Sequence, residues 1–255
     1  MTPFHFTKHY ETLAKAAAAA HHYGWLATHA KPLRQPALTV IGPASLTFEH
    51  VDGRHALKED LLSLAELLGD AHGAAWTSDL HAAQLDMPHE LRDGSLLAAF
   101  RSCREVALRN RREKGFLPDT AALHAMLTLL ERSADGPAAF YKDSNPRNFL
   151  ITEDGTIFSV DTDDLTLAPF GYDLAKLITT LIMTHGPSDP PNIEEALNSY
   201  NHAAARHDAQ LGATSRERLG DFLALHAVLT APYAGRHGYR YGWPHQSQHT
   251  QGTSS

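Results

Sequence analysis

The most constraining feature of the chain is a polar loop that leads into a predicted β-hairpin in its second half. Asp143 and Asn148 stand five residues apart in this loop, and two short apolar runs follow at 149–151 and 156–160. A Glu-Asp-Gly turn signal separates the two runs, and Asp161 ends the second one. The pattern therefore predicts a loop that is pinned by small strands and that carries carboxylate and carboxamide side chains.

These residue types suit the transfer of a phosphoryl group. That reaction needs little covalent chemistry from a protein: an acceptor for the proton of the attacking hydroxyl, and oxygen ligands for the Mg²⁺ that neutralises the phosphates. Asp143 is the candidate for the first role, and Asn148 and Asp161 are the candidates for the second. An Asp and an Asn at this spacing are common by chance, so the pair gains meaning only from the strands and the second aspartate around it.

The pattern of apolar residues changes from strand to helix along the chain. A short strand is predicted at 3–7, an alanine-rich helix at 11–25, and a hairpin at 37–41 and 46–51, where Gly-Pro separates the runs. The order predicts a small sheet with one helix, then a helical body interrupted by one hairpin, with the functional cleft between the two parts. Further helices are predicted at 57–72, 95–112, 120–132, 172–184, 193–209 and 215–231, and the end after Gly238 is predicted to fray.

The loop and hairpin residues, followed by Gly-Tyr-Asp-Leu-Ala at 171–175, resemble the catalytic core of aminoglycoside phosphotransferases and related small-molecule kinases. The resemblance implies that Asp143 is the catalytic base and that Asn148 and Asp161 bind magnesium. It also implies that Asp173 belongs to a helix that buttresses the loop, and an Asp near a helix start is in any case commonly a cap or local anchor.

The resemblance implies an α+β fold of the protein-kinase-like, bilobal type, with a truncated N-lobe sheet and a mainly helical C-lobe. It places an N-terminal nucleotide-binding lobe without a glycine-rich loop at 1–52 and a helical lobe with the catalytic hairpin at 53–240. We expect a disordered tail at 241–255. One departure lies in the loop itself, where Tyr141 stands at the position of the histidine usual in the family.

The resemblance extends more weakly to the first part of the chain. It implies that Lys8 binds the phosphates and that backbone groups at Glu49, His50 and Val51 meet the nucleobase of ATP or GTP. The two-stranded, glycine-rich phosphate flap expected before this lysine is missing from the sequence. Alanines occupy the helix where the glutamate partner of the lysine is expected, so Glu11 or another acid has to take its place.

Several other residues have open roles. Asp163 and Asp164 are our candidates for binding a cationic substrate, although a second metal site or solvation in the loop, the commonest fate of adjacent carboxylates, fits them as well. Lys142 and Arg147 either touch phosphate oxygens or are surface charges. Cys103 is the only cysteine, which excludes an intrachain disulfide and a thiolate metal cluster, and we expect it to be buried or half-buried.

The net charge of the chain limits the classes of molecule that it is expected to bind. The formal net charge of −7 and the pI near 6.2 argue against nucleic acid and anionic membranes as partners, since both select clustered Lys and Arg. A cationic small molecule is easier to accommodate. The chain lacks the pattern of a signal peptide and any apolar run of 18 residues, so we expect a cytoplasmic protein without a membrane span. An excess of Arg over Lys and many alanines hint at a bacterial source.

Two other functions compete with the kinase hypothesis. Asp161 and Asp163 imitate the Asp-x-Asp motif of haloacid-dehalogenase-type phosphatases, but they lie far down the chain and without a βαβ series. A non-catalytic, kinase-like binding protein that lost phosphate binding is the second alternative. Because the catalytic triad of residues is intact, we expect a Mg-dependent O-phosphotransferase. Its expected acceptor is a small-molecule hydroxyl, preferably on an antibiotic, as in antibiotic resistance, or on a biosynthetic intermediate of one.

Overall fold

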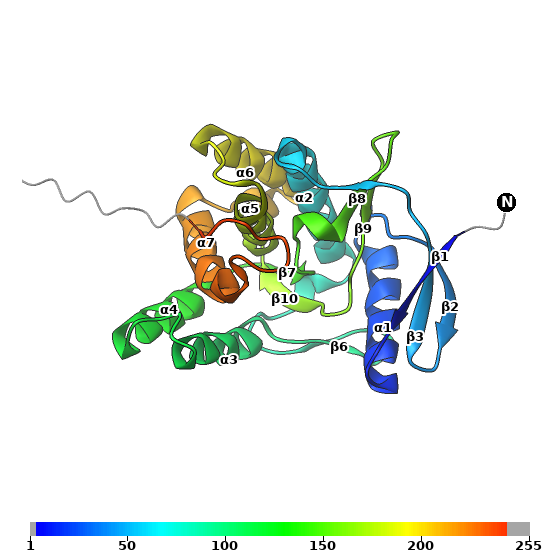
Figure 1. The fold of residues 1–255 in the computed structure, drawn as a ribbon, viewed down its shortest axis with the longest axis horizontal. Coiled ribbons are helices and arrows are strands. Elements are labelled where there is room, and N and C mark those ends of the chain that lie inside the picture. The colour runs from blue at the N-terminus through cyan, green and yellow to red at the C-terminus, as the bar shows by residue number, and fades with distance from the viewer. Residues whose placement is uncertain (1–3, 244–255) are drawn as a thin grey trace, which may run out of the picture.

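The structure is a computed structural model that describes residues 4–243. A small lobe of strands with one helix lies beside a larger, mainly helical lobe, and Figure 1 shows the two along the longest axis of the molecule. A short hairpin lies between them. This arrangement confirms the α+β organisation predicted from the apolar pattern.

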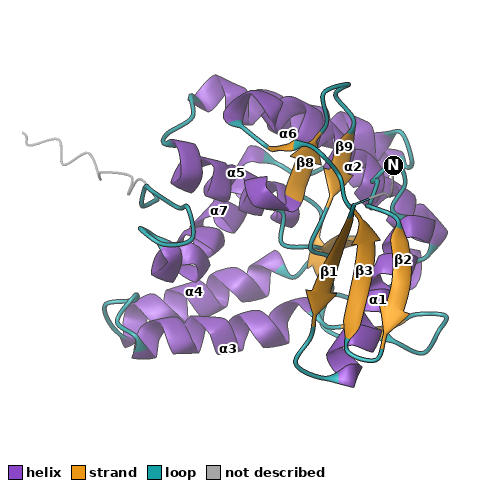
Figure 2. Cartoon of the chain, turned by 45° about the vertical axis from the view of Figure 1, so that its right-hand side comes forward, coloured by secondary structure: helices purple, strands orange, loops and turns teal. Residues whose placement is uncertain are grey.

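The small lobe is a three-stranded antiparallel sheet that packs against one helix (Figure 2). Its elements are β1 (His5–His9), α1 (Leu13–His29), β2 (Leu38–Gly42) and β3 (Ser45–Glu49). The strand order is β1-β3-β2, and Lys8 of β1 pairs in register with Leu46 of β3. Helix α1 begins after Thr12, whose side chain accepts a hydrogen bond from the Lys15 N–H as an N-cap.

The helices of the large lobe pack around one central helix. They are α2 (Leu61–Ser78), α3 (Phe100–Glu113), α4 (Thr120–Ser133), α5 (Tyr172–His185), α6 (Pro190–Ala205) and α7 (Arg216–Thr230). Helix α5 is buried at every position from 172 to 183, including its charged residues Asp173 and Lys176. Helices α2 and α6 approach closely at Gly69, where a Cβ would lie 2.2 Å from the carbonyl oxygen of Tyr200.

Short strands connect the lobes and hold the predicted loop. They are β4 (Arg54–His55), β5 (His89–Glu90), β6 (Leu96–Leu97), β7 (Ala138–Tyr141), β8 (Phe149–Ile151), β9 (Ile157–Ser159) and β10 (Thr166–Pro169). The predicted hairpin is confirmed as β8 and β9, with Phe149 opposite Ser159. Strand β10, which pairs antiparallel with β7, was not predicted because its four residues lack an alternating pattern.

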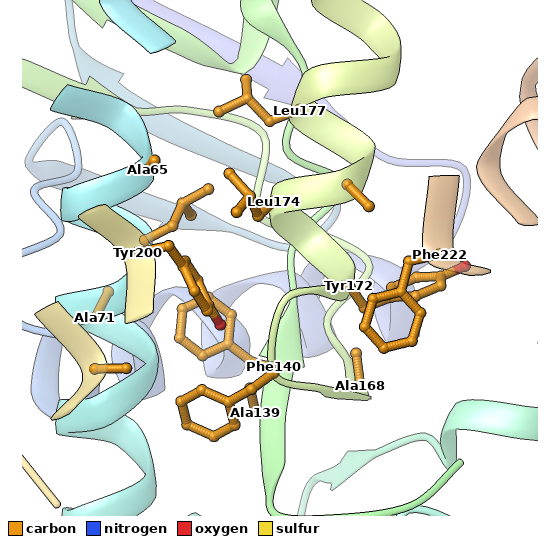
Figure 3. Packing of buried hydrophobic residues seen from close by; sticks show 14 of the residues in the cluster. Ala65, Ala71, Ala139, Phe140, Ala168, Tyr172, Leu174, Leu177, Tyr200 and Phe222 are labelled. Atoms are coloured by element: carbon orange, nitrogen blue, oxygen red, sulfur yellow. The ribbon is translucent and has the colours of Figure 1, made fainter. Parts of the chain in front are cut away.

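The apolar core fixes the start of the loop. Figure 3 shows Phe140 of β7 beside Tyr200 of α6, with Tyr172 of α5 facing Phe222 of α7. The Tyr172 and Phe222 rings meet edge to face at a centroid distance of 5.5 Å, a favourable aromatic geometry. Because Phe140 is fully buried, the polar residues that follow it begin from a rigid point.

The residues that directly follow Gly238 contact the large lobe. The prediction of fraying after Gly238 is wrong for its first part, since Tyr239 is buried and the Tyr241 N–H donates to the Met183 carbonyl at 2.9 Å. The remainder of the predicted tail, 244–255, lies outside the described residues. Within residues 4–243 we find no helix whose length and apolar character would allow it to span a membrane.

Candidate active site

The loop after β7 is tied to helix α5 by one buried carboxylate. Asp173 accepts hydrogen bonds from the Lys142 N–H at 3.2 Å, the Ser144 N–H at 2.8 Å and the Ser144 hydroxyl at 2.8 Å. Burial raises the pKa of Asp173, opposed by the Lys142 charge and by the bonds from Ser144, and the net shift is upward. The anchoring role expected for Asp173 is therefore present: three donors on the loop converge on one residue of the central helix.

Two of the predicted site residues have unusual backbone angles. Asp143 has φ 60° and Asp161 has φ 59°, in the left-handed region that L-residues avoid. His237 is the only other residue of this kind, apart from glycines, in the described part of the chain. Such conformations cost on the order of 1–2 kcal/mol and cluster at functional sites, where the surrounding structure enforces them. The geometry therefore singles out the same two aspartates as the sequence.

Asp143 sits in a dense hydrogen-bond network. Its Oδ1 accepts from the Tyr141 hydroxyl at 2.7 Å and lies 2.9 Å from Nζ of Lys176, and its carbonyl accepts from Asn148 Nδ2 at 2.9 Å. Burial raises the pKa of Asp143, but the Lys176 charge and the two hydrogen bonds outweigh it and leave the pKa below its usual value. Asp143 is therefore held ionised while about half of its side chain, 47%, stays exposed.

Lys176 contacts Asp143 but was not among the site residues predicted from the sequence. It lies on α5 one turn after Asp173, and only 9% of its side chain is exposed. Burial lowers the pKa of Lys176, but the nearby Asp143 charge raises it further, so the ammonium form is retained. The spacing of three residues from Asp173 was the available signal, because residues i and i+3 share one face of a helix.

Asn148 and Asp161 are the two residues whose side-chain oxygens are predicted to bind Mg²⁺. Nδ2 of Asn148 donates a hydrogen bond to the Asp143 carbonyl, which leaves the side-chain oxygen of Asn148 available. The Val160 N–H donates to the Asn148 carbonyl at 2.9 Å and so links the loop to the residue before Asp161. A carboxylate and a carboxamide oxygen are the donor types that Mg²⁺ prefers, so the residues fit that ion. Residues 4–243 contain no cluster of three or more His, Cys, Asp or Glu that would hold a metal by itself.

Lys8 reaches the same aspartate from the small lobe. Its Nζ lies 2.6 Å from Asp161 Oδ1 and also contacts the Asp163 carboxylate. Burial lowers the pKa of Lys8, but hydrogen bonds to these two carboxylates raise it above its usual value. Of the predicted partners of Lys8, Glu11 or another acid, Glu11 is not the one, because it pairs with Lys15 at 2.6 Å. Asp163 takes that place instead, and the Tyr10 hydroxyl holds it at 3.0 Å.

Two cavities meet at the loop. The first, of about 610 Å³, is lined by Lys8 and by the segment after β3 where the sequence predicts nucleobase contacts. In that segment the Glu49 and His50 N–H groups are bonded to the Ala37 and Phe4 carbonyls, while the Val51 N–H has no partner among the described residues. The second, of about 830 Å³, is lined by Asp143, Lys176 and residues of α3 and α7. The residues that line both cavities are Arg147, Asn148 and Asp161.

The remaining predicted residues divide between these cavities. Asp163 lines the cavity of Lys8 and Asp164 the larger one, so the two do not act as a pair. Lys142 is neither a phosphate contact nor a surface charge: it is 2% exposed, and its Nζ lies 4.3 Å from the centroid of the Phe149 ring. The expectation that Cys103 is buried or half-buried is also wrong, because it is exposed at the larger cavity.

A small sheet lobe, a helical lobe and a strained Asp loop between two cavities define a small-molecule kinase. The sequence pattern of the phosphotransferase enzyme family (APH) matches residues 5–212. The chain belongs to this family, as the resemblance to aminoglycoside phosphotransferases implied. A search of curated proteins gave no match.

Solved structures share the fold. A macrolide 2'-phosphotransferase from Brachybacterium faecium covers 93% of this chain and 82% of its own, with a TM-score of 0.53 and 14% identity. A choline kinase from Streptococcus pneumoniae covers 91% and 77%, with a TM-score of 0.58 and 13% identity. An aminoglycoside phosphotransferase from Streptomyces rimosus covers 89% and 86%, with a TM-score of 0.53 and 19% identity. These similarities confirm the protein-kinase-like, bilobal fold.

Proposed function

We propose that this kinase transfers the γ-phosphoryl group of ATP or GTP, with Mg²⁺, to a hydroxyl of a small molecule. The observation that carries the proposal is the shared wall between the two cavities: Asn148 and Asp161 line both, and Asp143 stands on the side of the larger one. A nucleotide in the smaller cavity and an acceptor in the larger one would meet at these three residues. In-line transfer requires such a meeting point.

The smaller cavity suits a nucleotide. The Val51 N–H, which has no partner among the described residues, would donate to a nucleobase, and Lys8 would offer a cation for phosphate oxygens near Asp161. Bound at Asn148 and Asp161, magnesium would supply neutralisation of the phosphate charge. Two proteins of similar fold were solved with adenine nucleotides, the Streptomyces rimosus enzyme with ADP and an amicoumacin kinase with AMP-PNP, which supports ATP as donor.

Asp143 would accept the proton of the attacking hydroxyl. Its lowered pKa keeps it ionised at neutral pH, and Tyr141 and Lys176 hold its Oδ1, so Oδ2 is the oxygen left for the substrate. Asn145 Nδ2 comes only to 3.5 Å of Oδ2, the limit of a hydrogen bond. An oriented base of this kind contributes about 10²–10⁴-fold to a rate.

The acceptor is, we propose, an antibiotic or a biosynthetic intermediate of one. Proteins with this fold include a macrolide 2'-phosphotransferase, an aminoglycoside phosphotransferase solved with streptomycin, and an amicoumacin kinase. The larger cavity has the volume for such a molecule, since sites for drug-sized ligands measure about 300–1,000 Å³. Asp164, which lines this cavity, remains our candidate for a substrate contact, whereas Asp163 is reassigned to holding Lys8.

The experiment is an acceptor screen. The protein is incubated with MgATP or MgGTP and a panel of hydroxyl-bearing antibiotics and their intermediates, and mass spectrometry detects the gain of one phosphoryl group. The proposal expects a gain that needs Mg²⁺ and disappears in Asp143→Asn. If no acceptor gains mass and nucleotide with Mg²⁺ produces no thermal shift, the chain is instead the non-catalytic binding protein that lost phosphate binding.

A further inference from the structure

The larger cavity is lined by an excess of positive charge, although the chain as a whole is acidic. Its cationic side chains come from three different elements: Arg104 and Arg111 from α3, Arg147 from the loop, and Lys176 from α5. The carboxylates in the same lining are Asp143, Asp161 and Asp164. The local charge balance therefore differs in sign from the formal net charge of −7.

The carboxylates of the lining are mostly engaged. Asp143 is paired with Lys176, and Asp161 is paired with Lys8 from the opposite cavity. Asp164 is exposed and forms no ion pair with the described residues, so it is the one carboxylate left to oppose the guanidinium groups. When the two paired carboxylates and Lys176 are left out, three arginines face one aspartate in the lining. The lining therefore keeps an excess of two positive charges.

The three guanidinium groups have neutral partners. Arg104 donates to the Phe100 carbonyl at 2.8 Å and to the Thr166 hydroxyl at 3.2 Å, and Arg111 donates twice to the Leu229 carbonyl, at 2.9 and 3.0 Å. Neither forms an ion pair with a carboxylate of the described chain. These bonds fix the direction of each group without cancelling its charge.

Aromatic rings and backbone hold the groups in place. Arg104 lies 4.8 Å from the Tyr141 ring centroid, next to the residue that contacts Asp143. Arg147 lies 4.9 Å from the Tyr239 ring centroid and donates to the His237 carbonyl. A guanidinium held by rings and carbonyls keeps part of its planar fork free, and that fork matches a carboxylate or a phosphate.

We propose that the acceptor of this kinase carries a carboxylate or phosphate group beside the hydroxyl that is phosphorylated, and that Arg111 and Arg147 bind this group. The inference deepens the proposed function and rests on the larger cavity being the acceptor site. It replaces the expectation of a cationic acceptor drawn from the net charge. A polycationic amine would face Arg104, Arg111 and Arg147 at short range, and only Asp164 would attract it.

The single cysteine is a built-in reporter for this charge. Cys103 is exposed and lines the cavity, so its rate of modification depends on the local potential. At low ionic strength, one measures its reaction with anionic 2-sulfonatoethyl and cationic 2-(trimethylammonium)ethyl methanethiosulfonate. Each rate constant is divided by the rate constant of the same reagent with free 2-mercaptoethanol, which corrects for the intrinsic reactivity of the reagent. We expect the anionic reagent to be favoured about threefold or more, since cavity potentials reach several kT.

Variants test whether the arginines of the cavity cause the preference for the anionic reagent. Arg111→Gln with Arg147→Gln should lower the ratio of anionic to cationic rates about threefold, and Asp164→Asn should raise it. Arg109→Gln is the matched control, because Arg109 is exposed on the same helix but does not line the cavity. A preference for the cationic reagent, or an equal effect of Arg109→Gln, overturns the inference. Circular dichroism checks the fold of each variant, and Arg147→Gln alone serves if the double variant does not fold.

The acceptor preference is measured separately. Glucuronate, glucose and glucosamine share a hydroxyl framework and differ in charge, and each is offered with MgATP beside the antibiotic panel. The inference expects phosphorylated compounds to be anionic and their KM to rise about tenfold or more in Arg111→Gln. A cationic best acceptor overturns it. If nothing is phosphorylated and MgATP does not bind, the proposed function fails, while the thiol rates still decide whether the cavity selects anions.

Discussion

Nζ of Lys176 lies 2.9 Å from Oδ1 of Asp143 and ties the candidate base to the helix that also anchors its loop. The same helix supplies Asp173, which holds the backbone on either side of Asp143 at Lys142 and Ser144. One buried helix therefore sets both the position and the ionisation of the base. The predictions that follow separate these two effects.

Replacing Lys176 by Met should change the pH profile of the enzyme. Burial alone raises the pKa of Asp143, and the Lys176 charge opposes it. Without that charge the pKa rises, so Asp143 becomes protonated at a higher pH and the acidic limb of kcat/KM moves upward. Activity at pH 5 should fall more than activity at pH 8. A profile parallel to the wild type would show that Lys176 only supports the fold.

Lys176→Arg and Tyr141→Phe are the matched controls for that profile. Arg keeps the positive charge, so the acidic limb should remain near that of the wild type. Tyr141→Phe removes one neutral hydrogen bond and should move the limb less than Lys176→Met does.

Asp163 and Asp164 are adjacent but should have different effects on nucleotide affinity. Asp163→Asn removes one of the two carboxylates that hold Lys8, and the Kd for MgATP should rise about fivefold, since a partly exposed ion pair is worth about 1 kcal/mol. Asp164→Asn should leave that Kd within about twofold because Asp164 lines the other cavity. Isothermal titration calorimetry measures both, and equal effects would contradict the division between the cavities.

Asp173→Asn should destabilise the protein strongly. The amide offers fewer acceptor sites to the three buried donors of Lys142 and Ser144, and unsatisfied buried donors cost about 1–3 kcal/mol each. We expect a loss of roughly 3 kcal/mol in the free energy of unfolding, measured in urea. Ser144→Ala, which removes only the hydroxyl bond, should cost about 1 kcal/mol. A smaller loss for Asp173→Asn than for Ser144→Ala would rule out the anchoring role.

His72 should make the protein sensitive to mild acid. Burial lowers the pKa of His72 to about 3, and its Nδ1 lies 2.7 Å from the Tyr200 hydroxyl. The unfolded chain, with a pKa near 6.5, therefore binds a proton that the folded one excludes. The stability due to this neutral histidine is full above pH 6.5 and is lost as the pH falls toward 3. Between pH 7 and 5 the loss is roughly 2 kcal/mol.

His72→Asn tests that dependence. Asn keeps an acceptor for Tyr200 but does not titrate, so the free energy of unfolding should fall less between pH 7 and 5 than in the wild type. His226 is also buried, with a pKa well below its usual value, and it contributes equally to both proteins. Parallel pH dependences would contradict the account of His72.

The sequence was sufficient for the class of fold and for the hairpin that holds Asp143, Asn148 and Asp161. Asp143, Asn148 and Asp161 are close along the chain, and the hairpin between them has local turn and strand signals, so short-range patterns predict them. The partners of these residues depend on tertiary contacts. Lys176 reaches Asp143 from a helix 33 residues later, and Lys8 finds Asp163 because two lobes meet. No periodicity in one sequence reports such pairings.

Predictions from residue type were wrong where a side chain has an exposure that is unusual for its type. Lys142 looked like a surface or phosphate-binding charge but is enclosed against Phe149, and Cys103 looked like a core residue but is exposed. The expectation of a cationic substrate came from the net charge, which averages over the whole surface, and our proposal of an anionic acceptor departs from that expectation. The arginines of α3 and of the loop gather in one cavity only after folding.

The central claim is that Asp143 serves the transfer step while Asp161 serves the nucleotide. The direct measurement pairs MgATP affinity with the rate of phosphoryl transfer to an acceptor found in the screen, for Asp143→Asn and Asp161→Asn. Asp143→Asn should keep the Kd for MgATP within about threefold and lower kcat by about 10²–10⁴-fold, whereas Asp161→Asn should weaken both. Equal loss of nucleotide affinity in the two variants, or near-normal kcat in Asp143→Asn, would contradict the account.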